Sequence, residues 1–264
     1  MDRRHFVKSG IAATAVGVTG FRAPSSPDSS AERRYYELRN YELRTDIKPE
    51  RIRAFTRDAL LPALGRAGAG TVGVMSPETG FPSQSLVVVI EYPSIAAVDA
   101  VAQALDADAA YTAARRAFEG ADDLPFVRYD SQLMRAFSGH PRIEVPRTEA
   151  GRPARMFELR TYEARSAAAL ERKIAMFNEG EIDLFRSIDM TPVFFGENVF
   201  GTRLPSLTYM LTFDDMAARM KAWSTFGSHP DWRRMNSDPR FAALGSVSVT
   251  NVAFLRPLGF SQLR

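Results

Sequence analysis

The chain has 264 residues, of which 45% are hydrophobic and 25% are charged, and it contains no cysteine. This composition is typical of a folded globular protein, and the lack of cysteine excludes disulfides, iron–sulfur clusters and cysteine nucleophiles. The excess of basic residues lies mainly in residues 1–31, and the rest of the chain carries 30 basic and 29 acidic residues, which argues against nucleic acid as a partner.

Residues 1–31 have the pattern of an export signal followed by a flexible tail. Arg3, Arg4, Phe6, Val7 and Lys8 resemble the twin-arginine motif, and the weakly apolar run 9–20 follows them. Small residues suitable for cleavage occur at 29–31 and, alternatively, at 20–23. We therefore expect export by the twin-arginine pathway to the periplasm or beyond. No later stretch is apolar enough to predict a transmembrane segment in the mature chain.

The rest of the chain repeats itself. The run Tyr36–Glu42 matches Phe157–Glu163, and the same difference of 121 residues pairs Gly80 with Gly201, Tyr111 with Trp232, and Arg135 with Arg256. A register held over some 100 residues indicates an internal duplication.

Each copy predicts the same elements in the same order. In the first copy, the patterns predict strands at 35–44, 71–75, 86–92 and 127–135, with helices at 49–66, 94–105 and just after Asp108. In the second, they predict strands at 156–165, 193–195, 207–213 and 247–256, with helices at 166–186, 214–223 and just after His229.

This order is βαββαβ twice, so the predicted fold class is α+β, with two tandem ferredoxin-like domains. We expect a first domain at 32–137, a Pro-, Gly- and Arg-rich linker at 138–155, and a second domain at 156–264. Each antiparallel sheet has one face without helices, and two such faces can pack together into a barrel-like pseudo-dimer. The pairing can occur within one chain, giving a monomer, or between chains, giving a homodimer.

The Glu-Leu-Arg-x-Tyr motifs, the Gly turns before Leu86 and Leu207, and the segment 229–232 together resemble the NIPSNAP family. The resemblance covers nearly the whole chain after the signal, and it implies the dimeric α/β-barrel fold. In animals that family is implicated in vesicle transport and mitochondrial quality control. The second copy fits the pattern better, because the first has Ala102 opposite Trp223 and Tyr111 opposite Trp232.

The repeated motif supplies the first candidate site. Glu37, Arg39 and Tyr41 share one face of a strand, and Glu158, Arg160 and Tyr162 share the matching face in the second copy. If the apolar faces meet the helices, these triads line the space between the sheets, where arginine and tyrosine can bind a carboxylate or phosphate. The alternative, which we favour, is a Glu–Arg pair that satisfies itself and fixes how the sheets pack.

His229 and Trp232 supply the second candidate. His229 can serve as a general base or a haem ligand, but its place before Pro230 favours a helix cap, as Asp108 does at the matching position. Trp232, with Trp223 and Phe226, can form an aromatic wall for a ligand, although core packing is the simpler interpretation. Met210, Met216 and Met220 are expected to fill gaps in the core.

Motifs for phosphate loops, dinucleotide binding, the hydrolase elbow and zinc proteases are missing from the sequence, and neither a metal site nor a cofactor is predicted. Two functions remain. The favoured one is a protein that binds a small ligand or a protein partner through the barrel or its surface. The alternative is a small-molecule enzyme, monooxygenase-like or haem-related, that uses the cavity between the sheets.

Overall fold

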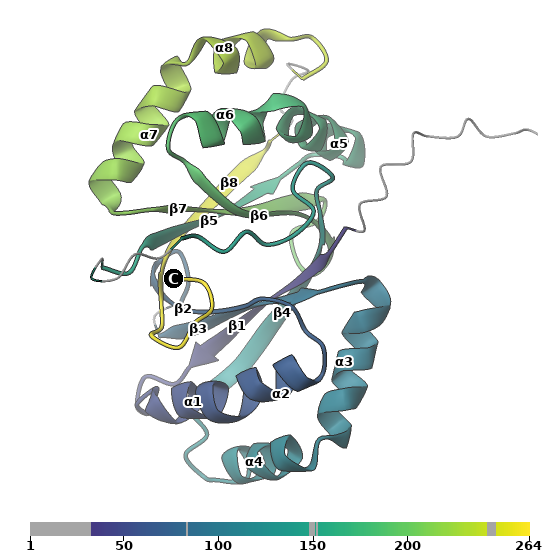
Figure 1. Ribbon diagram of the computed structural model, residues 1–264, viewed down its shortest axis with the longest axis vertical. Coiled ribbons are helices and arrows are strands. Elements are labelled where there is room, and N and C mark those ends of the chain that lie inside the picture. The colour runs from purple at the N-terminus through teal and green to yellow at the C-terminus, as the bar shows by residue number, and fades with distance from the viewer. Residues whose placement is uncertain (1–32, 83, 148–150, 152, 242–246) are drawn as a thin grey trace, which may run out of the picture.

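The computed structural model describes residues 33–82, 84–147, 151, 153–241 and 247–264. The export signal predicted for residues 1–31 lies outside the described residues. Two similar halves follow each other along the chain, and their helices lie at opposite sides of a central group of strands (Figure 1).

The elements of the two halves correspond one to one. The first half contains β1 (Tyr35–Leu43), α1 (Glu50–Phe55), η1 (Thr56–Leu60), α2 (Leu61–Arg66), β2 (Val72–Thr79), β3 (Ser85–Tyr92), α3 (Ile95–Ala107), α4 (Ala109–Glu119) and β4 (Phe126–Ala136). The second contains β5 (Met156–Glu163), α5 (Ala167–Met176), η2 (Phe177–Glu181), α6 (Ile182–Ser187), β6 (Thr191–Phe200), β7 (Ser206–Phe213), α7 (Met216–Ser228), α8 (Pro230–Ser237) and β8 (Val249–Pro257). The predicted strands and helices are all present, and β6 is longer than predicted.

The eight strands close into one antiparallel barrel in the order β1-β3-β2-β8-β5-β7-β6-β4. The ferredoxin-like sheet of each half joins the other at two seams, where β2 pairs with β8 and β4 pairs with β6. β1 and β5 stand four places apart in a fully antiparallel barrel, so they run in the same direction. The halves are therefore related by a rotation about the barrel axis, and the predicted pseudo-dimer forms within a single chain.

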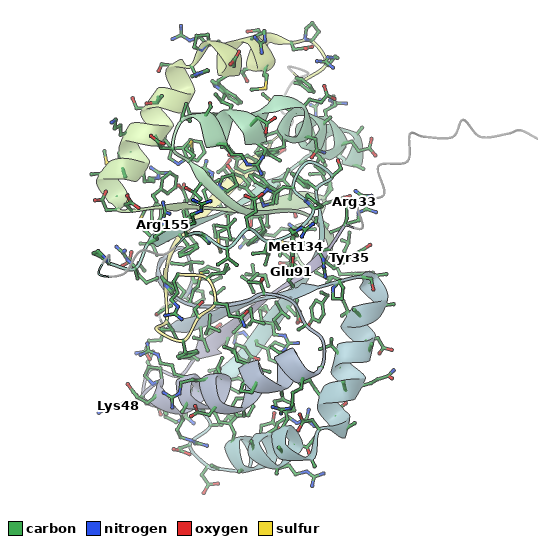
Figure 2. All side chains as sticks on the ribbon, viewed as in Figure 1. Arg33, Tyr35, Lys48, Glu91, Met134 and Arg155 are labelled. Atoms are coloured by element: carbon green, nitrogen blue, oxygen red, sulfur yellow. The ribbon has the colours of Figure 1, made fainter. Side chains whose placement is uncertain are left out.

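Apolar side chains from all eight strands form a cluster in the barrel interior. Tyr36 and Leu38 of β1, together with Phe157 and Leu159 of β5, belong to this inner cluster. Met134 and Glu91 lie between the two sets of helices, near the middle of the molecule (Figure 2). The polar faces of β1 and β5 consequently lie outside the barrel, under the helices. The expectation that the polar triads line the space between the sheets is therefore wrong.

The orientation follows from where each face finds its partners. The apolar residues of β1 and β5 pack in the inner cluster, whereas Glu37 and Glu158 find hydrogen-bond donors outside the barrel, such as Tyr92 and Trp223. The inner face is not wholly apolar, because Glu91, which stands opposite Tyr36, is buried there and accepts a hydrogen bond from Ile143 N. A buried polar group is stable where its hydrogen bonds are made, and the partners of Glu37 and Glu158 lie on the outer side.

A π-helical turn interrupts the first helix of each half at the same place. η1 and η2 start at Thr56 and Phe177, which are matching residues of the repeat. Gly180, within η2, leaves room for the side chain of Met235 in α8, because a Cβ there would come 2.9 Å from the methionine sulfur. A π-helical turn widens the backbone locally and is frequent at functional sites.

The segments that follow β4 and β8 also pack on the barrel. Glu144 N donates to Val193 O, and His140 is buried against the same strand, so the first part of the predicted linker is fixed to β6. After β8, Ser261 and Gln262 accept hydrogen bonds from backbone N–H groups of β2. Among the described residues, no helix has the length and hydropathy needed to cross a membrane.

Candidate functional site

On the polar face of β1, the charged side chains are paired with neighbouring residues of the first half. Arg39 Nε and Nη2 donate to the two carboxylate oxygens of Glu37 at 2.5 and 2.9 Å. Glu37 also accepts hydrogen bonds from Tyr92 Oη at 2.7 Å and from Ser131 Oγ at 2.6 Å. Burial alone would raise the pKa of Glu37, but these donors, Arg39 foremost, lower it overall. The self-satisfied Glu–Arg pair expected from the sequence is present in this half.

The matching carboxylate in β5 has more cationic partners. Glu158 is fully buried and accepts hydrogen bonds from Arg160 Nη1 at 2.7 Å, from Arg219 Nε and Nη2 at 3.0 and 2.8 Å, and from Trp223 Nε1 at 2.8 Å. Two guanidinium groups thus share one carboxylate. In the first half, Val98 and Ala102 stand where Arg219 and Trp223 stand in α7.

Arg160 is left with an unused donor. Its side chain is 13% exposed, and its Nε is buried without a hydrogen-bond partner among the described residues. The guanidinium carbon lies 4.3 Å from the ring centre of Trp223 and 5.5 Å from that of Tyr162. A buried donor without an acceptor is costly, so Arg160 Nε is a candidate contact for an acceptor group of a ligand.

Two tyrosines meet beside Arg160. The hydroxyl groups of Tyr162 in β5 and Tyr209 in β7 lie 2.7 Å apart. Tyr209 is fully buried, and burial first, with Tyr162 next, raises its pKa well above the ordinary value. Val88 stands at the matching place in the first half, so Tyr41 has no such partner there. We call the side chains described so far in this half the Arg160 site: Glu158, Arg160, Tyr162, Tyr209, Arg219 and Trp223.

A buried ion pair lies next to this site. Lys173 Nζ donates to Glu181 Oε2 at 2.6 Å across the π-helical turn, and both side chains are almost completely buried. The ammonium group of Lys173 lies 4.5 Å from the ring centre of Phe177, 5.4 Å from that of Trp232 and 5.8 Å from that of Tyr162. Burial raises the pKa of Glu181, although Lys173 opposes the shift.

Sequence reasoning missed Lys173, Glu181, Arg219 and Tyr209. The signal was available in the repeat, because each of them replaces an aliphatic residue of the first half. Those aliphatic residues are, in the same order, Ile52, Leu60, Val98 and Val88.

His229 acts as a helix cap, as expected. Its Nδ1 accepts a hydrogen bond from Asp231 N at 3.2 Å at the start of α8, and Asp108 caps α4 in the same way through Tyr111 N. The polar contacts of His229 in the described structure are with Asp231, whereas Trp232 reaches the site through the ammonium group of Lys173. The structure therefore groups Glu158, Arg160, Tyr162 and Trp232, and it leaves His229 at the helix end.

The aromatic residues of the second half pack as the sequence indicates. Phe226 is buried and its ring centre lies 5.4 Å from that of Trp223 and 4.5 Å from that of Trp232. The expectation for the methionines is correct only for Met210, which is fully buried in the barrel. It is wrong for Met216 and Met220, which are 41% and 62% exposed on α7. The reason is that α7 lies at the periphery and covers the sheet with only one narrow edge.

Haem does not fit the histidines that the structure describes. His229 Nδ1 accepts a hydrogen bond, and His140 Nε2 lies 3.1 Å from the carbonyl oxygen of Val193, to which it must donate. In the neutral form both rings therefore carry their proton on Nε2, the nitrogen that would have to bind iron. Within the described ranges, no group of three or more acidic or histidine side chains could hold a metal ion.

An open groove of about 490 Å³ lies in the first half, away from the Arg160 site. Its lining is largely charged and includes an ion pair between Arg51 and Asp123: Ile47, Lys48, Glu50, Arg51 and Asp123. Lys48 lies at the outer border of the molecule (Figure 2). None of the predicted site residues lines this groove.

Comparison with known families decides the relationship of the chain. The family model described as NIPSNAP matches residues 36–138 and again residues 157–262. The chain belongs to the NIPSNAP family. Both halves are thus NIPSNAP domains, and the comparison with curated proteins found no match.

Solved structures show how widely this NIPSNAP fold is shared. A putative monooxygenase from Fusobacterium nucleatum has 8% identity and a TM-score of 0.58, covering 86% of this chain and 94% of its own. A putative monooxygenase from Lactobacillus acidophilus has 10% identity and a TM-score of 0.57, with the same coverage. A NIPSNAP family protein from Agrobacterium tumefaciens has 18% identity and a TM-score of 0.38, covering 46% of this chain and 99% of its own. At these identities the likeness to the two putative monooxygenases shows a common fold alone.

Proposed function

We propose that this NIPSNAP protein binds a small molecule in its second half, between the sheet and the helices at the Arg160 site. One observation carries the proposal: only around the Glu–Arg pair of the second half does the described structure place further polar groups, which are Tyr209, Arg219, Lys173 and Glu181, although both halves have the same backbone plan. The first half keeps aliphatic side chains at the matching positions, so the fold itself does not require the charges. Buried charges without a structural need are typical of functional sites.

Ligand binding at this place is tested by comparing matched variants. A metabolite library is screened by thermal shift and native mass spectrometry against the wild type and Arg219→Val, which introduces the residue of the first half. We expect hits that stabilise the wild type and bind Arg219→Val at least about tenfold more weakly. Val98→Ala, in the first half, is the control and retains binding. Equal binding to all three proteins would rule out the Arg160 site as the binding place.

A second candidate is an enzyme that uses the same site, and the Lys173–Glu181 pair favours it. Acid–base groups of enzymes are often buried beside a partner that shifts their pKa. The names of the two structural neighbours suggest a monooxygenase-like form of this activity. Incubating the library hits with the protein in air, and following product and oxygen by mass spectrometry and an oxygen electrode, tests this candidate. Turnover that Glu181→Gln abolishes while binding persists would support it, and unchanged ligands would exclude it.

We also propose that residues 1–31 direct export through the twin-arginine pathway. The support is the order of a charged head with paired arginines, a weakly apolar run and small residues. A reporter fused behind residues 1–31 should appear outside the cytoplasm. Replacing Arg3 and Arg4 together by lysine should retain it inside, and continued export of that variant would contradict the proposal.

A further inference from the structure

The charge of the Arg160 site indicates what kind of molecule it takes. In the first half, one guanidinium group and one carboxylate balance each other. In the second half, Arg160 and Arg219 share Glu158, so this trio carries one positive charge in excess. The adjacent Lys173 and Glu181 form a pair of their own, so among the described residues they supply no counter-charge for that excess. A buried excess charge is costly unless a counter-charge is present.

We propose that the ligand of the Arg160 site is a monocarboxylate with an apolar or aromatic body, a proposal that rests on the binding function proposed above. One negative charge balances the trio. A dianion such as a phosphate monoester would bring a second charge close to Glu158, which is already buried there.

Arg160 offers a carboxylate an unused donor. Arg160 uses Nη1 for Glu158, and its Nε remains without a partner. A carboxylate binds arginine best in the plane of the guanidinium group, with its oxygens on neighbouring nitrogens. Since Trp223 covers one face of the guanidinium group at 4.3 Å, the ligand is directed to this unused edge.

The tyrosine pair supplies a second donor. Of two hydroxyl groups in one hydrogen bond, one donates and the other keeps a proton for a different acceptor. Because Tyr209 is 0% exposed, the arrangement that leaves no buried hydroxyl proton unpaired has Tyr209 donating to Tyr162. The hydroxyl proton of the half-buried Tyr162 is then available to a ligand beside Arg160. Guanidinium and phenol donors together are typical of carboxylate recognition.

The rest of the surroundings suits an apolar body. The rings of Tyr162, Trp223 and Trp232 pack against the core of this half but remain partly exposed. A planar apolar group would cover them and recover the free energy of their burial.

Three probes of similar shape and different charge test this inference in the full chain: benzoate, benzamide and phenyl phosphate. Isothermal titration at pH 7.5 should show benzoate binding at least about tenfold more tightly than the other two. Arg160→Gln should abolish the preference for benzoate over benzamide, and the first-half control Arg39→Gln should leave it unchanged. Tyr162→Phe should weaken benzoate binding about five- to tenfold, while Tyr41→Phe should not. Tyr162→Phe also serves as the second test variant if circular dichroism shows that Arg160→Gln does not fold.

The outcomes separate this inference from the proposed function. If benzamide or phenyl phosphate binds as tightly as benzoate, the inference of a monocarboxylate ligand is overturned, while the proposed binding of a small molecule remains intact. Failure of all three probes to bind would likewise overturn it, while the library screen would still decide whether the site binds any small molecule. An unchanged preference in Arg160→Gln would remove Arg160 as the carboxylate contact.

Discussion

Lys173 Nζ and Glu181 Oε2 lie 2.6 Å apart across a π-helical turn, where the sister half of the same barrel carries Ile52 and Leu60. One chain therefore contains both a charged and an aliphatic solution to the same packing position. The comparison allows the contribution of the ion pair to be measured without reference to another protein.

The double variant Lys173→Ile with Glu181→Leu, which copies the first half, should be as stable as the wild type or more stable. Replacing a buried ion pair by apolar residues of similar volume is often neutral or stabilising. Glu181→Leu alone should lower the free energy of unfolding by about 3 to 5 kcal/mol, because it leaves a buried ammonium group unpaired. Urea denaturation measures both. A double variant clearly less stable than the wild type would contradict the packing argument.

Glu158 should control stability in acid. Burial would raise its pKa, but the donors Arg219, Trp223 and Arg160 lower it overall. A carboxyl group with a lower pKa in the folded state stabilises the protein above its unfolded pKa, about 4.3, and loses this effect as pH falls toward the folded value. Glu158→Gln should therefore lower the free energy of unfolding by about 3 kcal/mol at pH 7 and flatten its decline below about pH 5.

The measurement is a series of urea titrations between pH 3 and pH 7. The exposed residue Asp183, whose side chain is 84% exposed, provides the control, and Asp183→Asn should change stability by less than about 0.5 kcal/mol. Parallel curves for the wild type and Glu158→Gln would show that this carboxyl group does not titrate differently on folding.

His229 should affect stability and leave ligand binding unchanged. Its ring caps α8, so His229→Ala should cost about 1 kcal/mol of unfolding free energy. His229→Asp should restore the cap, since Asp108 serves in this way at the matching position. Affinity for the library hits is measured alongside the denaturation curves. A loss of affinity in His229→Asp would place His229 in the binding site.

Gly80 should be required for one seam of the barrel. Its φ of +88° disfavours other residues, and a Cβ would come 2.5 Å from the Cβ of Ala253 in β8. Gly80→Ala should destabilise the protein by at least about 2 kcal/mol. Gly259→Ala, which meets no atom within 4 Å, is the matched control and should be nearly neutral. Thermal denaturation of the two variants tests the difference.

The architecture could be predicted because the repeat fixes it from many positions at once. At a constant offset of 121 residues, the strand and helix patterns of one half recur in the other. Gly80 and Gly201 mark the same turn in both halves. Sequence patterns describe which residues share a face of a strand. They do not say which face lies inside, because in this barrel both faces of β1 and β5 are covered.

The candidate site was predicted only in part for a related reason. Arg160 and Tyr162 stand in a conspicuous motif, but that motif is also present in the first half, where it is closed. What distinguishes the halves are residues on other elements, such as Arg219 and Lys173, that come close only after folding. Charged residues at positions that are aliphatic in the sister copy were the available signal.

Closure of the barrel within one chain has a genetic consequence. In a barrel made of two identical subunits, every codon change appears twice, so a group that is useful on one side must be tolerated on the other. A tandem gene removes this constraint, and the two sides can diverge independently. Arg219 and Glu181, opposite Val98 and Leu60, are changes of this kind. One copy can preserve the scaffold while selection alters the chemistry of the other.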